Sequence, residues 1–284
     1  MDKKRQNHLI QLHCPFQSIS SLIPSGVDIG IQIEFVDGNK YFITQTNAKP
    51  RLKIIEAKLY IEVCLLKPQA ILKIHQRLAN GTLQLPFVGD VNKTYSIEVG
   101  HLQTHINISL KDPFEQCLVI LHRNLCLIGD YKRHYQKWER HKLKSCFLES
   151  SLNVKLPSIP AGNASDMPGY QFDTPSKTRA SYFVAMDQLG KFNENGVDLS
   201  MSKWLDSHFC LPFRLSPELA HYGPDLSEKI LQKPILPNNA RYNLFMEFET
   251  TTEYVIRVTV LYKQARIIAL NSSMQAFKSF DIDQ

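Results

Sequence analysis

Hydrophobic and polar residues alternate along much of the chain, most clearly near the C-terminus. Every second residue of Glu253–Lys263 is apolar from Tyr254 to Val260, and Asn243–Glu249 alternates in the same way. A period of two places the apolar side chains on one face of an extended strand. Because only Thr250–Thr252 separates these runs, we predict a β-hairpin, which the apolar run Ala265–Leu270 extends to a three-stranded antiparallel meander.

Strand patterns recur on both sides of one predicted helix. They are found at Val27–Val36 and Tyr41–Thr46 (joined through Asp37-Gly38), in the second half of Leu52–Leu66, and at Thr94–Val99, Thr104–Leu110, Cys117–Leu127 and Phe147–Leu156. The helix is predicted at Pro68–Ala79, because proline suits a first helical turn and Asn80-Gly81 is a typical stop. Thr178–Leu189 fits a short helix or a strand, and Ser216-Pro217 is typical of a helix start.

The order of these elements predicts the fold class. There is no alternation of strands and helices, so we expect an all-β protein, a jelly-roll β-sandwich with one connecting helix and long loops. The predicted organisation is an extended N-terminal arm at 1–26, a strand region at 27–66, the connecting helix at 67–82 and the main sandwich at 83–284. The longest predicted loop is Pro157–Pro175, and loops of this size tend to be either insertions that contact partners or mobile segments.

Composition is that of a globular protein with a mildly basic charge. The 284 residues are 43% hydrophobic and carry a net charge of +6, with a pI near 8.9. No run approaches the length of a membrane span, and no apolar stretch follows the charged Met1–Arg5, so we expect no membrane association and an intracellular location. The six cysteines are scattered, without a C-x-x-C pair, which favours buried free thiols.

The sequence contains no motif that predicts catalysis. Phosphate-binding loops, nucleophile elbows and dinucleotide fingerprints are absent. His101 and His105 are four residues apart but lie in a predicted strand, without a third ligand, and Asp281 and Asp283 fit a solvated tail. We therefore predict no catalytic residue, no cofactor and no metal. An enzyme stays as a third alternative, because a catalytic triad is assembled in space.

One basic segment is a candidate nucleic-acid surface. Between Asp130 and Ser145, six Lys or Arg residues are interleaved with aromatic residues. Basic side chains bind phosphates and aromatic rings stack on unpaired bases. The alternative is a solvated loop or short helix whose aromatic residues pack on the sheet beneath it. The candidate contacts are Lys132, Arg133, Lys137, Trp138, Arg140, Lys142 and Lys144.

Several phrases, in order along residues 52 to 275, resemble one protein family. The phrases are Ala57-Lys58-Leu59-Tyr60-Ile61-Glu62-Val63, Lys67-Pro68-Gln69-Ala70-Ile71-Leu72 with His75, Leu78 and Gly81, Leu85-Pro86-Phe87, Gly129-Asp130-Tyr131-Lys132, Leu156-Pro157-Ser158-Ile159-Pro160, Phe209–Leu219 and the final strands Asn243–Leu270. In these phrases the chain resembles capsid-like proteins of Maverick/Polinton elements, which are virus-like DNA transposons. Arg214 and Gln136-Lys137-Trp138 depart from the family pattern.

The resemblance implies a structural role. Such proteins carry two jelly rolls and pack as homotrimers through sheet edges and loops, so this chain would be mainly the C-terminal jelly roll, with 27–66 as a remnant of the first. Pro157–Pro175 and the arm before Pro24 then become interface segments, and the basic run would face packaged DNA in the nucleus or in a virion-like particle. The alternative function is a host β-sandwich protein that binds nucleic acid through residues 130–144.

Overall fold

The structure is a computed structural model. Most of its strands form two antiparallel sheets, as expected for the predicted β-sandwich. Its five isolated described positions are residues 23, 24, 27, 30 and 32. The described ranges are 55–60, 63–79, 81, 83–109, 116–128, 137–150, 153, 155–159, 166–193, 198–214, 241–270 and 276–278. The predicted hairpin around Asp37-Gly38 and the helix start at Ser216-Pro217 lie outside the described residues.

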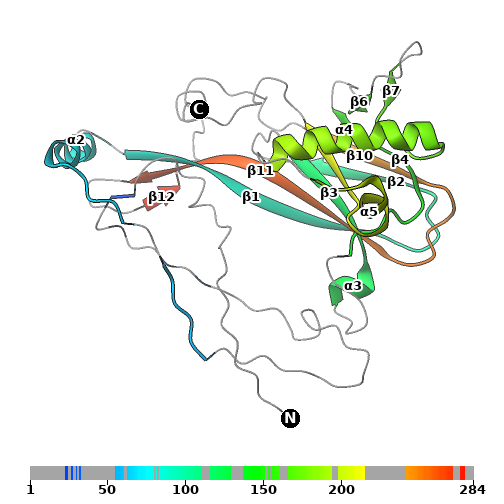
Figure 1. The fold of residues 1–284 in the computed structure, drawn as a ribbon, viewed down its shortest axis with the longest axis horizontal. Coiled ribbons are helices and arrows are strands. Elements are labelled where there is room, and N and C mark those ends of the chain that lie inside the picture. The colour runs from blue at the N-terminus through cyan, green and yellow to red at the C-terminus, as the bar shows by residue number, and fades with distance from the viewer. Residues whose placement is uncertain are drawn as a thin grey trace.

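Two antiparallel sheets form the body of the molecule (Figure 1). The first sheet has the order β1 (Leu83–Ile97), β11 (Ile256–Leu270), β3 (Gln116–Arg123) and β9 (Cys210–Arg214), with β12 (Ala276–Lys278) on β11. The second has the order β2 (Gln103–Ser109), β10 (Arg241–Phe248), β4 (Leu143–Ser150) and β5 (Lys155–Leu156), with β8 (Tyr170–Gln171) on β4.

The strand pairs are nested along the chain. The first strand β1 pairs with β11, β2 pairs with β10, β3 pairs with β9, and β4 pairs with β5, all antiparallel. A chain paired in this way is one long antiparallel ribbon wrapped into two layers, which gives the strand order of a jelly roll. The predicted β-sandwich is therefore confirmed for the described residues.

The main hydrophobic core lies between the two sheets. Val258 and Val260 of β11 and Leu244 and Met246 of β10 are fully buried in one cluster, because alternate residues of each strand point inward. Strand β3 is buried at every position from Gln116 to His122, so both of its faces are covered. This explains why β3 reads as a continuous apolar run and not as an alternating one.

The protein has more helix than the all-β prediction allowed. The longest helix is α4 (Pro175–Asn193), at the position where a short helix or a strand was expected, and it packs against β8 and β9. Its buried residues Ser181, Ala185 and Leu189 are spaced four apart. Aromatic residues on its other sides, such as the exposed Phe183, obscure this helical period in the sequence.

Two short helices further correct the prediction. The predicted strand Cys117–Leu127 ends at Arg123, where α3 (Asn124–Ile128) begins. Helix α5 (Met201–Ser207) has Ser200 as its N-cap, whose side chain accepts a hydrogen bond from the Lys203 amide. The predicted loop Pro157–Pro175 contains the paired strands β6 (Ser158–Ile159) and β7 (Met167–Pro168), in addition to β8.

The predicted C-terminal hairpin is wrong. Strands β10 and β11 are separate members of the two sheets and do not pair with each other, and β11 continues through Leu270, so there is no third strand of a meander. A strand with one buried face has the same alternation in a hairpin and in a sandwich. The residues between the strands, Glu249–Val255, therefore form a connection that crosses from one sheet to the other.

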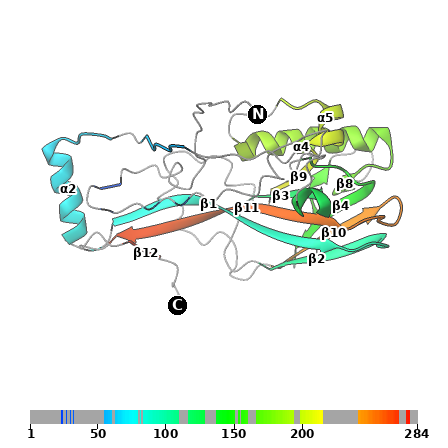
Figure 2. The same cartoon turned by 90° about the horizontal axis from the view of Figure 1, so that it is seen from below.

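Strands β1 and β11 also continue beyond the sandwich as a two-stranded ribbon. β3 pairs with β11 only over Ile256–Lys263, and beyond this point the ribbon carries β12 and leads to α2 (Pro68–Ala79) (Figure 2). The bounds of α2 confirm the helix predicted at Pro68–Ala79. Among the described residues before it, 55–60 and 63–67 belong to no strand, so the predicted strand at Leu52–Leu66 is not found there.

Candidate interaction surfaces

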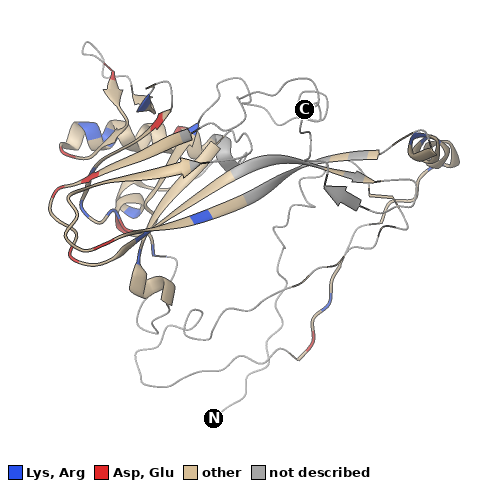
Figure 3. Ribbon diagram, turned by 180° about the vertical axis from the view of Figure 1, so that it is seen from behind, with Lys and Arg blue, Asp and Glu red and all other residues tan. Residues whose placement is uncertain are grey.

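The described part of the basic segment forms ion pairs with its own Glu139 and with three glutamates that are distant in the sequence. Lys132 and Arg133 lie outside the described residues. Basic residues (blue) and acidic residues (red) lie close together at the end of the sandwich where β10 connects to β11 (Figure 3). The nitrogen–oxygen distances are 2.8 Å for Lys137–Glu139, 3.1 Å for Arg140–Glu249, 3.1 Å for Lys142–Glu253 and 2.9 Å for Lys144–Glu247.

These ion pairs balance the charge of the segment without burying it. The hydrogen bond from Lys144 lowers the pKa of Glu247 and raises the pKa of Lys144 in turn. Because the pairs are partly exposed, each contributes only about 0–1 kcal/mol to stability, and a phosphate group can compete for the same cations. Nucleic-acid binding by this segment therefore stays a prediction.

Trp138 packs against the rest of the fold. Its ring lies edge-on to His122 and His208, with centroid distances of 6.4 Å and 6.5 Å, and it contacts the main core cluster. Its backbone N–H donates to the Ser207 carbonyl, and its carbonyl accepts from the Phe209 N–H. Stacking on a base would require the ring to leave these contacts. This position fits the alternative reading, in which the aromatic residues pack on the sheet.

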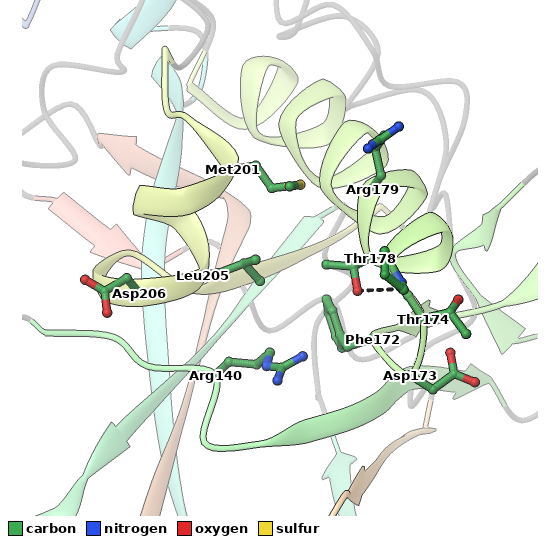
Figure 4. A pocket seen from close by; sticks show the side chains of 10 residues that line it. Arg140, Phe172, Asp173, Thr174, Thr178, Arg179, Met201, Leu205 and Asp206 are labelled. Atoms are coloured by element: carbon green, nitrogen blue, oxygen red, sulfur yellow. Dashed lines mark hydrogen bonds between the residues drawn. The ribbon is translucent and has the colours of Figure 1, made fainter.

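A pocket of about 560 Å³ opens between Arg140 and helices α4 and α5 (Figure 4). Phe172 and Leu205 form apolar walls, and the Arg140 guanidinium lies 5.8 Å from the Phe172 ring centroid. Thr178 donates its hydroxyl to the Thr174 carbonyl over 2.9 Å, which closes the first turn of α4. No local pattern in the sequence predicts this pocket, because its walls come from three separate segments.

Charged and polar side chains line the pocket beside its apolar walls. Its two acidic residues are Asp173 and Asp206, and its basic residues are Arg140 and Arg179. Asp173 is paired with Lys177 at 2.8 Å, which lowers the pKa of the carboxyl group. The lining contains two threonines, Thr174 and Thr178, but no cysteine, histidine or serine. It is suited to hold an apolar side chain next to a guanidinium.

The largest collection of exposed apolar side chains precedes and includes the start of α2. Of the twelve large hydrophobic residues that are exposed in the described part of the chain, seven lie between residues 55 and 72. Leu65 is 98% exposed and Tyr60 is 78% exposed. Contiguous exposed apolar surface typically marks an interaction site. The seven, which we call the apolar segment, are Ile55, Leu59, Tyr60, Val63, Leu65, Ile71 and Leu72.

Other classes of site are not seen among the described residues. No three His, Cys, Asp or Glu side chains in this part of the chain gather closely enough to hold a metal ion. No helix there is long and apolar enough to span a membrane. Burial raises the pKa of the core thiols of Cys117 and Cys146 well above the ordinary value, which makes them unreactive.

Comparisons with known proteins found similar structures only. No family model and no curated protein sequence matches the chain. Among solved structures, it is similar to a chain of the virophage Sputnik determined by cryo-EM, with a TM-score of 0.40 and 8% identity over 72% of this chain and 40% of that chain. The chain is also similar to PBCV-1 VP54 fitted into a cryo-EM reconstruction of Sputnik, with a TM-score of 0.41 and 10% identity over 76% of this chain and 55% of that chain.

A third similar structure is the mavirus major capsid protein, with a TM-score of 0.35 and 6% identity over 69% of this chain and 41% of that chain. The chain thus spans between 40% and 55% of the length of the three proteins.

Proposed function

We propose that this protein is a structural, capsid-like protein of a virus-like DNA transposon of the Maverick/Polinton type, and that it acts by self-association into homotrimers and not by catalysis. The ordered sequence phrases between residues 52 and 275 support the family assignment. The nested strand pairing of the two sheets supports the jelly-roll fold that such proteins use.

The observation that carries the proposal is the apolar segment. A lone soluble protein gains nothing from leaving Leu65 and Tyr60 in water, because each buried side chain of this size is worth about 1.5–3 kcal/mol. Most of the segment precedes α2, and its last two residues are on α2 itself. This helix lies at the end of the ribbon away from the sandwich core (Figure 1). Contacts made there would leave the sandwich itself unchanged, so we infer that a second copy of the chain covers this surface.

The proposal is tested by replacing part of the apolar segment. The test variant combines Leu59→Ser, Tyr60→Ser, Val63→Ser and Leu65→Ser, and its mass in solution is compared with that of the wild type by sedimentation velocity. The matched control combines Val99→Ser and Leu125→Ser, which are 57% and 56% exposed but lie on the sandwich body and α3. Removing the same kind of apolar side chain from the control positions should not affect association.

We expect the wild type and the control to sediment as trimers and the segment variant to sediment as a folded monomer. Circular dichroism checks that the variant keeps its β content. A wild type that sediments as a monomer would overturn the proposal. Trimers in all three proteins would retain self-association but show that it uses a surface other than the apolar segment.

A further inference from the structure

The connection between β10 and β11, Glu249–Val255, is held against the turn that leads into β4. The Glu249 backbone N–H donates to the Lys142 carbonyl over 2.8 Å. Two ion pairs join the same segments, Arg140–Glu249 and Lys142–Glu253, each at 3.1 Å. Because this connection carries the chain from one sheet to the other, its attachment closes one end of the sandwich.

Between the two ion pairs, His141 points into the protein. The turn places His141 and Lys142 at φ of 53° and 56°, in the left-handed region that few residues with side chains adopt. This backbone conformation directs the imidazole inward, where its side chain is 1% exposed. Its Nδ1 lies 3.0 Å from the Tyr254 hydroxyl on the connection. Its Nε2 is buried without a hydrogen bond of good geometry, and the Leu121 backbone lies close enough to favour the charged ring slightly.

The charged groups around His141 come from its own turn, from β3 and from the connection. The Glu139 carboxylate lies 3.8 Å from Nδ1 and is already held by Arg123 of β3 at 3.1 Å. The Arg123 guanidinium also covers the Tyr254 ring at 4.1 Å. His122 of β3 is a second buried imidazole, and its Nδ1 lacks a partner. A proton on His141 would therefore add a third cation to a site in which the Glu139 carboxylate already pairs with Arg123 and Lys137.

These surroundings favour the neutral ring. Burial lowers the pKa of His141 to about 4, and the positive charge of Arg123 adds to this effect, whereas Glu139 opposes it. Burial also lowers the pKa of His122. A histidine exposed by opening of this site titrates near its ordinary value of 6.5. The closed state is therefore fully favoured above pH 6.5 and loses stability as the pH falls from 6.5 towards 4.

We propose that His141 is an acid-sensitive latch, which holds the β10–β11 connection on the sandwich while its ring is neutral and releases the connection when the ring is protonated. The neutral ring fills a buried site and forms a hydrogen bond with the Tyr254 hydroxyl. The protonated ring must be hydrated and can leave that site only if the connection moves. This inference concerns the closure of the sandwich and does not depend on self-association.

The experiment is hydrogen exchange of the connection amides at pH 7.5 and pH 4.5, corrected for intrinsic exchange rates. It compares the wild type with His141→Asn, which keeps a polar group near Tyr254 but does not titrate. In the wild type, acidification should raise the opening equilibrium of residues 249–255 roughly 70-fold more than in the variant. Because other carboxylates titrate in both proteins, only the difference between the two reports on His141. The matched control is His105→Asn, at an exposed histidine, which should behave as the wild type.

Equal pH dependence in the wild type and in His141→Asn would overturn the proposal. If the variant does not fold, the wild type alone decides by NMR titration of the His141 ring. A ring that stays neutral down to about pH 5 and then titrates together with the loss of protection at 249–255 supports the latch. A ring that titrates near pH 6.5, with the connection still protected, contradicts it.

Discussion

The sandwich body and the ribbon end are built from the same two strands but are stabilised differently. In the body, β3 pairs with β11 on the side away from β1, and a large cluster of buried side chains separates the two sheets. At the ribbon end, the buried residues among the described side chains are Leu78 of α2, Leu85 of β1 and Leu270 of β11. The pairing of β1 with β11 is continuous between these regions. The two regions therefore differ in whether a second sheet covers these strands.

This difference separates the region that holds the fold from the region that is available for contacts. A two-stranded ribbon is at best marginally stable in water by itself, and the three leucines that are buried among its described side chains supply little area compared with the main core. The ribbon end and the apolar segment therefore gain most from a partner. Substitutions in each region should reveal the difference, and the four predictions below run from the largest expected effect to the smallest.

Removing Trp204 from the body should have the largest effect. Its side chain is fully buried, packs on Phe209 at a centroid distance of 5.1 Å and donates its ring N–H to the Cys210 carbonyl over 3.0 Å. Trp204→Ala leaves a cavity and an unpaired carbonyl, so we expect a loss of about 3–5 kcal/mol in the free energy of unfolding, measured with urea. Phe183→Ala, at an exposed aromatic residue, should change it by less than about 0.5 kcal/mol.

Substitutions at two glycines with positive φ should distinguish the cost of backbone strain from the cost of a steric clash. A Cβ on Gly169 would lie 2.5 Å from the Phe147 Cβ and 2.6 Å from the Cys146 carbonyl, whereas a Cβ on Gly100 would meet nothing within 4 Å. Gly100→Ala should cost about 1 kcal/mol from strain alone. Gly169→Ala should cost about 1–3 kcal/mol more, because β4 must move. Equal urea midpoints for the two variants would show that β4 yields without cost.

A core substitution at the ribbon end should act locally. Leu78→Ala removes one of three buried side chains there, and we expect hydrogen exchange at 83–90 to accelerate while the global free energy of unfolding falls by less than about 1 kcal/mol. Leu148→Ala in the body, also at a buried leucine, should cost about 2–5 kcal/mol globally. A global loss from Leu78→Ala as large as that from Leu148→Ala would mean that the two regions unfold together.

Substitutions in the basic segment should affect stability least. Lys142→Ala breaks an exposed ion pair with Glu253, and the expected change in the free energy of unfolding is within about 0.5 kcal/mol. If the segment binds DNA, replacing Lys132, Arg133, Arg140 and Lys142 with alanine should weaken binding and flatten its dependence on salt by up to about 0.9 per lost phosphate contact. Unchanged binding with an unchanged salt slope would exclude these residues as contacts.

Local patterns in the sequence predicted local structure well. The helix Pro68–Ala79 is found with the predicted bounds, because a proline start and an Asn-Gly stop act within a few residues. Strand β1 was predicted only over its last few residues. Its first half contains Pro86, Gly89 and Asp90, which interrupt the alternation, and its place in the sheet depends on pairing with β11.

Features that depend on distant partners were not predicted. The hairpin prediction failed because alternation does not reveal which strand pairs with which, and the connection instead binds elsewhere: Thr252 donates its hydroxyl to the Glu98 carbonyl over 2.7 Å. The basic residues were identified by type, but the acidic partner of Lys144 is Glu247, 103 residues away. The burial of His141 likewise follows from a turn and a crossing connection that no local pattern indicates.

Self-association is tested most directly by the molar mass of the wild type, measured by light scattering after size exclusion at low and at high salt. Contacts made by apolar side chains are not weakened by screening, so we predict the mass of a trimer under both conditions. A mass of 32.6 kDa, that of one chain, at both salt concentrations would contradict self-association and would leave nucleic-acid binding by the basic segment as the function to test.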